Sequence, residues 1–164
     1  MRTLVLLRHS KAERPEGYPA DIDRPLSKRG RADAAAAGRW IVAQGLVPDH
    51  VLCSPSVRTR ETWQFARSPI GEVSILYEQS LYFGGASEML ELIQESDQTV
   101  STLLVIGHNP TVSIVSARLD PQGTMIDDGL RTSGIAVHRF EGGWADLEPG
   151  KAPRTAEHTA RGAS

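Results

Sequence analysis

The chain has 164 residues, of which 40% are hydrophobic, and 18 Lys and Arg against 20 Asp and Glu give a formal net charge of −2. A chain of this length is typical of a single domain that buries about 70% of its unfolded surface. The charge balance argues against a general nucleic-acid-binding protein, and the single cysteine, Cys53, excludes an internal disulfide framework. Because no stretch approaches 18 apolar residues, we expect a soluble, cytoplasmic protein.

Four apolar segments predict buried strands of one sheet. Residues 3–7 and 102–106 are continuous, leucine-rich and β-branched, which is typical of strands covered on both faces. Shorter segments at residues 50–53 and 73–76 predict two further strands. The continuous rather than alternating pattern favours a mostly parallel sheet with helices on both sides.

The C-terminal part of the chain combines a predicted hairpin with a polar tail. Residues 134–140 alternate enough for an edge or half-exposed strand, and residues 144–147 would close a hairpin with it. Residues 149–164 contain no Val, Ile, Leu, Met, Phe, Tyr or Trp, so this segment cannot build a core of its own. We therefore expect one domain over residues 1–148 and a disordered tail over residues 149–164.

Helices are predicted between the strands. Ser27 is a capping residue for an alanine-rich helix that extends through Ala43, in which Gly30 and Gly38 would permit close packing. Three further helices are predicted to begin at Ser54-Pro55, at Ser87 and at Asn109-Pro110. Strands that alternate with helices predict an α/β fold, a three-layer α/β/α sandwich with a mostly parallel central sheet.

Basic side chains follow three of the predicted strands at the points where these strands end. Arg8 and His9 directly follow the first strand. Arg58 comes shortly after the strand at residues 50–53, and His108 comes shortly after the strand at residues 102–106. Because ligands of open α/β sheets bind outside the carboxyl ends of the strands, we expect these four side chains to converge.

Such a cluster of arginines and histidines suits phosphoryl chemistry. Guanidinium groups match phosphate oxygens with fixed, permanently charged forks. A histidine among these cations loses its proton readily, and a neutral imidazole can attack phosphorus to form a phosphohistidine. A second histidine can stabilise the charge on the equatorial oxygens. A lone Arg-His pair at a strand end is more often structural, so the prediction depends on all three strand ends together.

Five blocks of the sequence form a recognisable set. They are Leu4–Ser10, Asp23–Gly30, Ser54–Thr62, Leu81-Tyr82 with Met89–Ile93, and Val105–Pro110. In order and spacing these blocks resemble the histidine phosphatase superfamily, and in particular its small bacterial branch typified by the phosphohistidine phosphatase SixA. The resemblance implies a phosphoglycerate mutase-like fold and a phosphatase activity that needs neither a metal ion nor another cofactor.

The resemblance also implies roles for individual residues. His9 would be the nucleophile that is phosphorylated during turnover. Arg8, Arg58 and His108 would surround the phosphoryl group as catalytic and substrate-binding residues. Arg24 would be a further substrate contact, and the second block of the resemblance carries it.

The general acid is not identified by the resemblance. Larger members of the superfamily protonate the leaving group with a carboxylate, and another branch has an aspartate directly after the second histidine, where this chain has Asn109. Glu78 is the first candidate, with Glu13 and Glu88 as others, although a carboxylate in such a position, taken singly, is more often a solvated surface group. Because imidazole leaves far more easily than an alkoxide, this pattern favours a phosphohistidine substrate.

Three functional hypotheses stay open. The first is a metal-independent phosphatase that acts through phospho-His9 on a phosphohistidine protein. The second is a phosphomonoesterase for a small phosphorylated metabolite, and the third is a non-catalytic phosphate-binding module. A mutase is less favoured, because the short segment at residues 68–81 leaves little room for an insertion that encloses the substrate. The expected partner is a phosphorylated protein or small molecule, not nucleic acid or a membrane, and the oligomeric state is left open.

Overall fold

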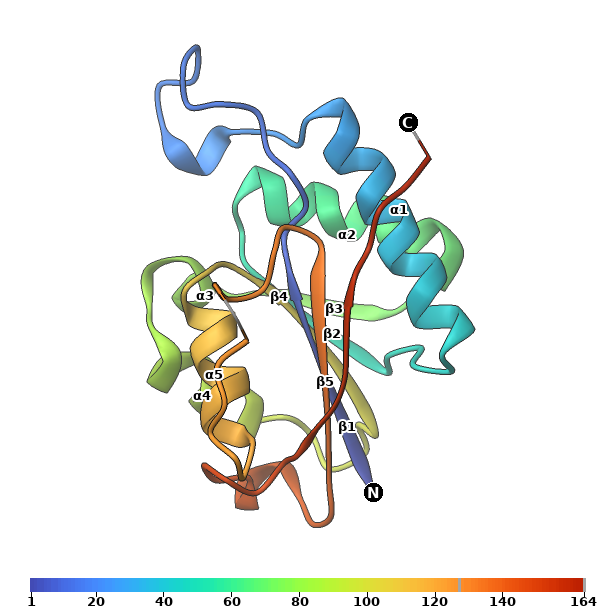
Figure 1. Cartoon of the computed structure of the whole chain (residues 1–164), viewed down its shortest axis with the longest axis vertical. Coiled ribbons are helices and arrows are strands. Elements are labelled where there is room, and N and C mark those ends of the chain that lie inside the picture. Colours follow the sequence, from blue (N-terminus) through green and yellow to red (C-terminus); the bar gives the residue numbers. More distant parts are fainter. Residues whose placement is uncertain (127, 164) are drawn as a thin grey trace.

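A six-stranded sheet with helices on both faces organises the chain in the computed structural model, which describes residues 1–126 and 128–163 (Figure 1). The strands are β1 (Arg2–Arg8), β2 (His50–Cys53), β3 (Ser74–Tyr77), β4 (Thr102–Gly107), β5 (Gly134–Phe140) and β6 (Arg154–Thr159). Their order in the sheet is β3-β2-β4-β1-β5-β6. The first four strands are parallel to one another, whereas β5 pairs antiparallel with both β1 and β6. The predicted mostly parallel α/β architecture is confirmed.

The helices cover the sheet in two layers. They are α1 (Lys28–Ala43), α2 (Val57–Ile70), α3 (Ser80–Phe83), α4 (Ala86–Gln94) and α5 (Thr111–Leu119), with two 3-10 helices, η1 (Asp21–Asp23) and η2 (Trp144–Asp146). Leu4 and Leu6 of β1 belong to the core under α4 and α5, whereas Val5 and Leu7 belong to the core under α1 and α2. This alternation is why a buried strand must be apolar at every position. Within the described residues, none of the helices is long and apolar enough to cross a membrane.

Two glycines let α1 pack closely, as the sequence predicts. Ser27 is the N-cap of α1, and its Oγ accepts a hydrogen bond of 3.0 Å from the backbone N–H of Gly30. A Cβ atom at Gly30 would collide with the carbonyl of Lys11, and one at Gly38 would collide with the carbonyl of Ala66 in α2. The two helices can therefore lie against each other on one face of the sheet (Figure 1). At the end of β1, the backbone N–H of Ser10 donates to the hydroxyl of Thr62 in α2.

The C-terminal part of the chain differs from the expectation. β5 is an interior strand between β1 and β6, not an edge strand, and residues 144–146 form η2 instead of the second strand of a hairpin. Trp144 points into the core, 1% exposed, and its indole N–H donates to the carbonyl of Val100. A large apolar side chain that reaches an existing core is better satisfied there than on a solvated hairpin.

The expected disordered tail over residues 149–164 is a second correction, because residues 154–159 form β6. This strand pairs antiparallel with β5, and the ladder continues from Ala160 N–H to the carbonyl of Ser133. His158 stacks on Trp40 of α1 with ring centroids 4.7 Å apart. Backbone pairing to a free sheet edge holds a polar strand that has no large apolar residue of its own. Residue 164 lies outside the described residues.

Candidate active site

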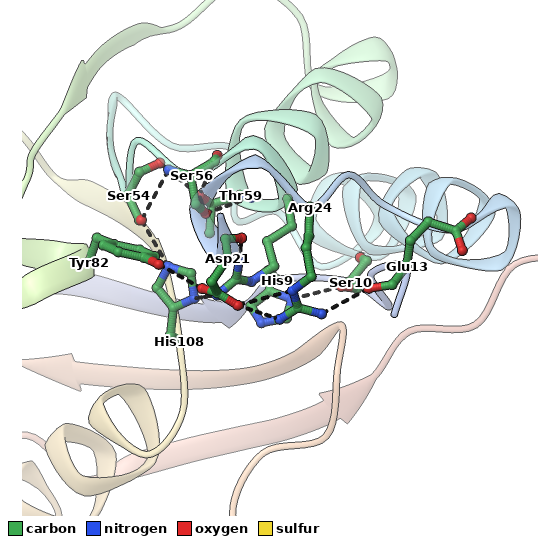
Figure 2. A network of polar contacts seen from close by, with 11 residues as sticks. His9, Ser10, Glu13, Asp21, Arg24, Ser54, Ser56, Thr59, Tyr82 and His108 are labelled. Atoms are coloured by element: carbon green, nitrogen blue, oxygen red, sulfur yellow. Dashed lines mark hydrogen bonds and ion pairs between the residues drawn. The ribbon is translucent and has the colours of Figure 1, made fainter. Parts of the chain in front are cut away.

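The carboxyl ends of β1, β2 and β4 bring the predicted site residues together, and Figure 2 shows His9, Arg24 and His108 among them. Arg8 pairs with Gly107 in the parallel ladder, so the next residues, His9 and His108, lie side by side with ring centroids 5.2 Å apart. At the end of β2, the backbone N–H of Ser54 donates to the carbonyl of Ile106. The three strand ends therefore converge as the sequence predicts.

His9 has one committed and one free ring nitrogen. Its Nδ1 lies 2.7 Å from the carbonyl oxygen of Ser10. Because a carbonyl oxygen can only accept, Nδ1 carries the proton, and in the neutral ring Nε2 keeps its lone pair. The side chain is 8% exposed, and burial together with His108, Arg58 and Arg8 lowers the pKa of His9 to about 3, against the bond to Ser10 that raises it. His9 is therefore a neutral imidazole at pH 7 with Nε2 available as a nucleophile.

His108 is held between a hydroxyl and a guanidinium. Its Nε2 lies 2.8 Å from Ser54 Oγ, and its Nδ1 lies 3.4 Å from Nη2 of Arg58. Because a guanidinium nitrogen can only donate, Nδ1 is the acceptor and Nε2–H donates to Ser54. Burial, and then the charge of Arg58, lower the pKa of His108 to about 4. In the free protein the nitrogen nearest to Arg58 therefore carries a lone pair.

Arg58 comes from the first turn of α2, whose N-cap is Ser56 and not Ser54 as expected. Ser54 instead supplies the hydroxyl that orients His108. The Arg58 side chain is 6% exposed, and its Nε is buried without a hydrogen-bond partner among the described residues. Arg60, by contrast, is exposed, and its guanidinium stacks 4.0 Å from the ring centroid of Tyr77. The two arginines therefore have different surroundings, Arg58 at the site and Arg60 at the surface.

Arg8 forms the other side of the basic cluster. Its Nη1 donates to the carbonyl of Leu130 at 3.0 Å. Its Nε is buried and has no hydrogen-bond partner in the parts of the chain that the structure describes. Burial, and then the nearby charge of Arg58, lower the pKa of Arg8. The half-buried Arg8 and the buried Arg58 thus each retain a buried, unsatisfied Nε–H near two histidines, an arrangement that is costly unless an acceptor binds there.

Asp21 joins the arginines of the site, and sequence reasoning missed it. Its Oδ2 accepts hydrogen bonds from Tyr82 O–H at 2.6 Å and from Nη2 of Arg58 at 2.9 Å. Its Oδ1 accepts from Nε of Arg24 at 3.0 Å and from Nη2 of Arg24 at 2.8 Å. The hydrogen bond from Tyr82, and then those from Arg24 and Arg58, hold the pKa of the Asp21 carboxyl well below its usual range. Asp21 is therefore a carboxylate at neutral pH.

Arg24 reaches the site through Asp21. Besides its two bonds to that carboxylate, its Nη1 donates to the carbonyl of Glu13 at 2.8 Å, so all three of its nitrogens are engaged. The segment is anchored to α2, because Leu26 N–H donates to the Glu61 carboxylate at 2.7 Å. The position of Asp21 one helical turn before Arg24 was a signal for their pairing, but its contacts with Arg58 and Tyr82 depend on the fold.

The candidate general acids take different positions around this cluster. Glu78 lines a separate hollow of about 480 Å³ between β3 and α4, Glu88 is exposed on α4, and Glu13 contributes only its backbone carbonyl. Among the described residues, no side-chain hydrogen bond joins these three carboxylates to the histidines. Asn109, which follows His108, donates to the carbonyl of Leu130 at 2.7 Å and is thereby committed to holding a loop.

A metal ion has no evident place in this arrangement. Within residues 1–126 and 128–163, no group of three or more His, Cys, Asp or Glu is placed to hold one. The positive charge of the cluster comes from Arg8, Arg24 and Arg58. Arginines, histidines and hydroxyls in this geometry can bind a tetrahedral oxyanion and transfer a phosphoryl group.

Comparisons with known proteins agree on one family. A family model described as the histidine phosphatase superfamily (branch 1) matches residues 4–82. One solved structure, proposed to be the phosphohistidine phosphatase SixA of Nakamurella multipartitia, is 31% identical in sequence. The match covers 97% of this chain and 96% of the other chain, with a TM-score of 0.85. A protein of Mycobacterium tuberculosis is 40% identical over 162 residues, which is 94% of this chain and 100% of that protein.

This chain belongs to the histidine phosphatase superfamily and is of the SixA type. A protein histidine phosphatase SixA solved with tungstate shares the fold, with a TM-score of 0.82 and 22% sequence identity over 96% of both chains. Membership supports a phosphatase that acts on phosphorylated substrates. The matched range contains Arg8, His9, Arg24 and Arg58, whereas His108 lies beyond it.

Proposed function

We propose that this protein hydrolyses protein phosphohistidine through a covalent phosphohistidine intermediate on His9. The observation that carries the proposal is the tautomer of this buried imidazole. Because Nδ1–H is committed to the Ser10 carbonyl, Nε2 is the nitrogen with a lone pair, in a neutral ring beside two guanidiniums. A buried neutral histidine has little structural reason to lie between permanent cations, whereas a nucleophile toward a bound phosphoryl group has one.

Arg8 and Arg58 would bind the phosphoryl group. The Nε atoms of both are buried and unsatisfied among the described residues, and a buried donor without an acceptor costs about 1–3 kcal/mol. Phosphate oxygens would satisfy these donors with short, charge-assisted hydrogen bonds. The same contacts would stabilise the charge spread over the equatorial oxygens in the transition state.

Turnover would proceed in two displacements. First, the Nε2 lone pair of His9 forms a bond to phosphorus while the P–N bond of the substrate breaks, and its electron pair leaves with the substrate imidazole, which takes up a proton. Second, water attacks phospho-His9, giving inorganic phosphate and restoring the neutral imidazole. His108 Nδ1 lies 3.4 Å from Arg58 in the free protein and must gain a proton before it can donate to a phosphoryl oxygen.

The nature of the leaving group supports phosphohistidine over an alkyl phosphate ester. Imidazole leaves with a conjugate-acid pKa near ~6.5, whereas an alkoxide needs a proton donor during the step. Asp21 is held ionised by its hydrogen bonds, and Asn109 is engaged with a backbone carbonyl. Glu78 lines a hollow and has no side-chain hydrogen bond to either histidine among the described residues, so it remains a candidate acid only if its carboxyl reaches the leaving group.

A side-by-side comparison of kcat/KM tests the proposal. The substrates are a phosphohistidine peptide and glycerol phosphate, assayed with the natural protein, with Glu78→Gln, and with Glu91→Gln of the exposed face of α4 as the matched surface control. We expect the phosphohistidine peptide to be hydrolysed faster, and both variants to retain this rate. Efficient hydrolysis of glycerol phosphate that collapses only in Glu78→Gln would make the protein a phosphomonoesterase with Glu78 as its acid. Binding of phosphate without hydrolysis of either substrate would instead indicate a non-catalytic module.

A further inference from the structure

We propose that Asp21 is a specificity-determining residue, because its carboxylate takes the place at which a second acidic group of a substrate would bind. The site would then accept a phosphoryl group whose leaving group has no further negative charge close by. This inference rests on the proposed function, because it presumes that Arg8 and Arg58 bind the phosphoryl group.

The Arg24 guanidinium is already engaged with a carboxylate. Its Nε and Nη2 form the side-on fork that suits carboxylates, and both donate to Oδ1 of Asp21, at 3.0 and 2.8 Å. Its remaining nitrogen donates to the carbonyl of Glu13. Arg24 therefore has no free fork for another anion while Asp21 is in place.

This occupied fork lies next to the proposed phosphoryl site. Asp21 accepts hydrogen bonds from Arg24 on Oδ1 and from Nη2 of Arg58 on Oδ2, the latter at 2.9 Å. The same Arg58 nitrogen lies 3.4 Å from His108 Nδ1. Figure 2 shows Asp21 between Arg24 and the ring of His108, with Tyr82 on the same side. One carboxylate thus connects Arg58, at the proposed phosphoryl clamp, with Arg24, the next guanidinium that an acidic group of a substrate could reach.

Asp21 is held ionised and remains accessible to a ligand. Tyr82 O–H donates to it at 2.6 Å, and its hydrogen bonds keep the carboxyl pKa low. Its side chain is 50% exposed, so it lies at the mouth of the site and not beneath it. A substrate group that approaches Arg24 therefore meets a negative charge first.

The charge balance of the cluster leads to the same inference. Arg8, Arg24 and Arg58 with Asp21 carry two net positive charges when both histidines are neutral. A phosphoryl group carries about −1.5 to −2 at pH 7, so it matches this charge by itself. A phosphorylated histidine in a protein is flanked by neutral amides and fits, whereas a small phosphorylated acid brings a charge that nothing in this cluster balances.

Two matched ligands test the inference by calorimetry on the full chain. Methylphosphonate has only the phosphonate group, and phosphonoacetate adds one carboxylate to it. We expect the natural protein to bind methylphosphonate at least as tightly as phosphonoacetate. In Asp21→Asn the freed Arg24 fork should shift this preference toward phosphonoacetate by about twofold to fivefold, the scale of one ion pair at an exposed site.

Two further variants separate the local effect from a general change of charge. Asp23→Asn alters the charge equally in the same 3-10 helix, where Asp23 is exposed, and should keep the natural preference. Asp21→Asn combined with Arg24→Gln should lose the preference for phosphonoacetate, because the fork is gone. An equal shift in Asp23→Asn, or persistence of the gain in the double variant, would overturn the assignment.

The outcomes also distinguish this inference from the proposed function. A natural protein that prefers phosphonoacetate overturns the role of Asp21 directly, without any variant. A protein that binds methylphosphonate and hydrolyses phosphohistidine, but whose preference is the same in folded Asp21→Asn, overturns the role of Asp21 alone. Failure of the natural protein to bind either phosphonate, together with no turnover, contradicts the proposed function on which this inference rests.

Discussion

Replacing Arg58 by alanine should lower kcat/KM by about 10-fold to 150-fold, whereas the same change at Arg60 should leave it within about twofold. Arg58 is 6% exposed and holds a buried, unsatisfied Nε, while both of its other nitrogens donate to Asp21. Loss of one charge-assisted contact with the phosphoryl group removes about 1.5–3 kcal/mol, and each ~1.4 kcal/mol is a factor of ten in rate. Arg60 stacks on Tyr77 at the surface, where a substitution has little effect.

The assay is steady-state hydrolysis of p-nitrophenyl phosphate, with circular dichroism to show that each variant folds. Arg58→Lys should fall between the natural protein and Arg58→Ala, because it keeps the charge but loses the planar fork. Asp21 retains its bonds to Arg24 and Tyr82 in these variants, so the loop that carries it should stay in place. Equal losses in Arg58→Ala and Arg60→Ala would refute the placement of Arg58 at the phosphoryl group.

Three further predictions concern the histidines and the absence of a metal requirement. Ser54→Ala removes the acceptor of the His108 Nε2–H bond and should lower kcat/KM by up to about tenfold, whereas Ser54→Thr should restore it. Equal kcat/KM in the natural protein and both variants would contradict this prediction. NMR titration should show His9 neutral down to about pH 3. Because the pKa of His9 in the folded protein lies below its unfolded value of about 6.5, the unfolded state binds more protons between these two values. The free energy of unfolding should therefore fall as the pH drops through that window, and it should fall less in His9→Gln. Activity should survive chelators, because arginines supply the positive charge, and a loss restored by a divalent ion would contradict this.

The sequence predicted those parts of the molecule whose signals are local. Continuous apolar runs located β1, β2 and β4, because a strand buried on both faces must be apolar at every position. Parallel strands end at the same edge, so the residues that follow them had to meet. For this reason the convergence of His9 with His108, 5.2 Å apart, followed from the sequence alone.

The features that the sequence did not predict depend on contacts between distant segments. Asp21 becomes part of the site only because an exposed 3-10 helix lies over Arg58 and Tyr82, and neither partner is close to it in sequence. β6 forms because β5 offers a free edge, which hydrophobicity alone cannot reveal. Ser54 has the composition of an N-cap, but the fold uses its hydroxyl for His108 and the next serine, Ser56, as the cap.

The covalent intermediate on His9 is the central claim, and trapping it is the most direct test. The protein is incubated briefly with labelled phosphoramidate, quenched in alkali, and mapped by mass spectrometry and phosphorus NMR. Acid-labile phosphate should be found on Nε2 of His9, the nitrogen that the bond from Nδ1–H to Ser10 leaves free, and His9→Ala should show neither label nor turnover. Label on another residue, or turnover by His9→Ala at the natural rate, would contradict the account.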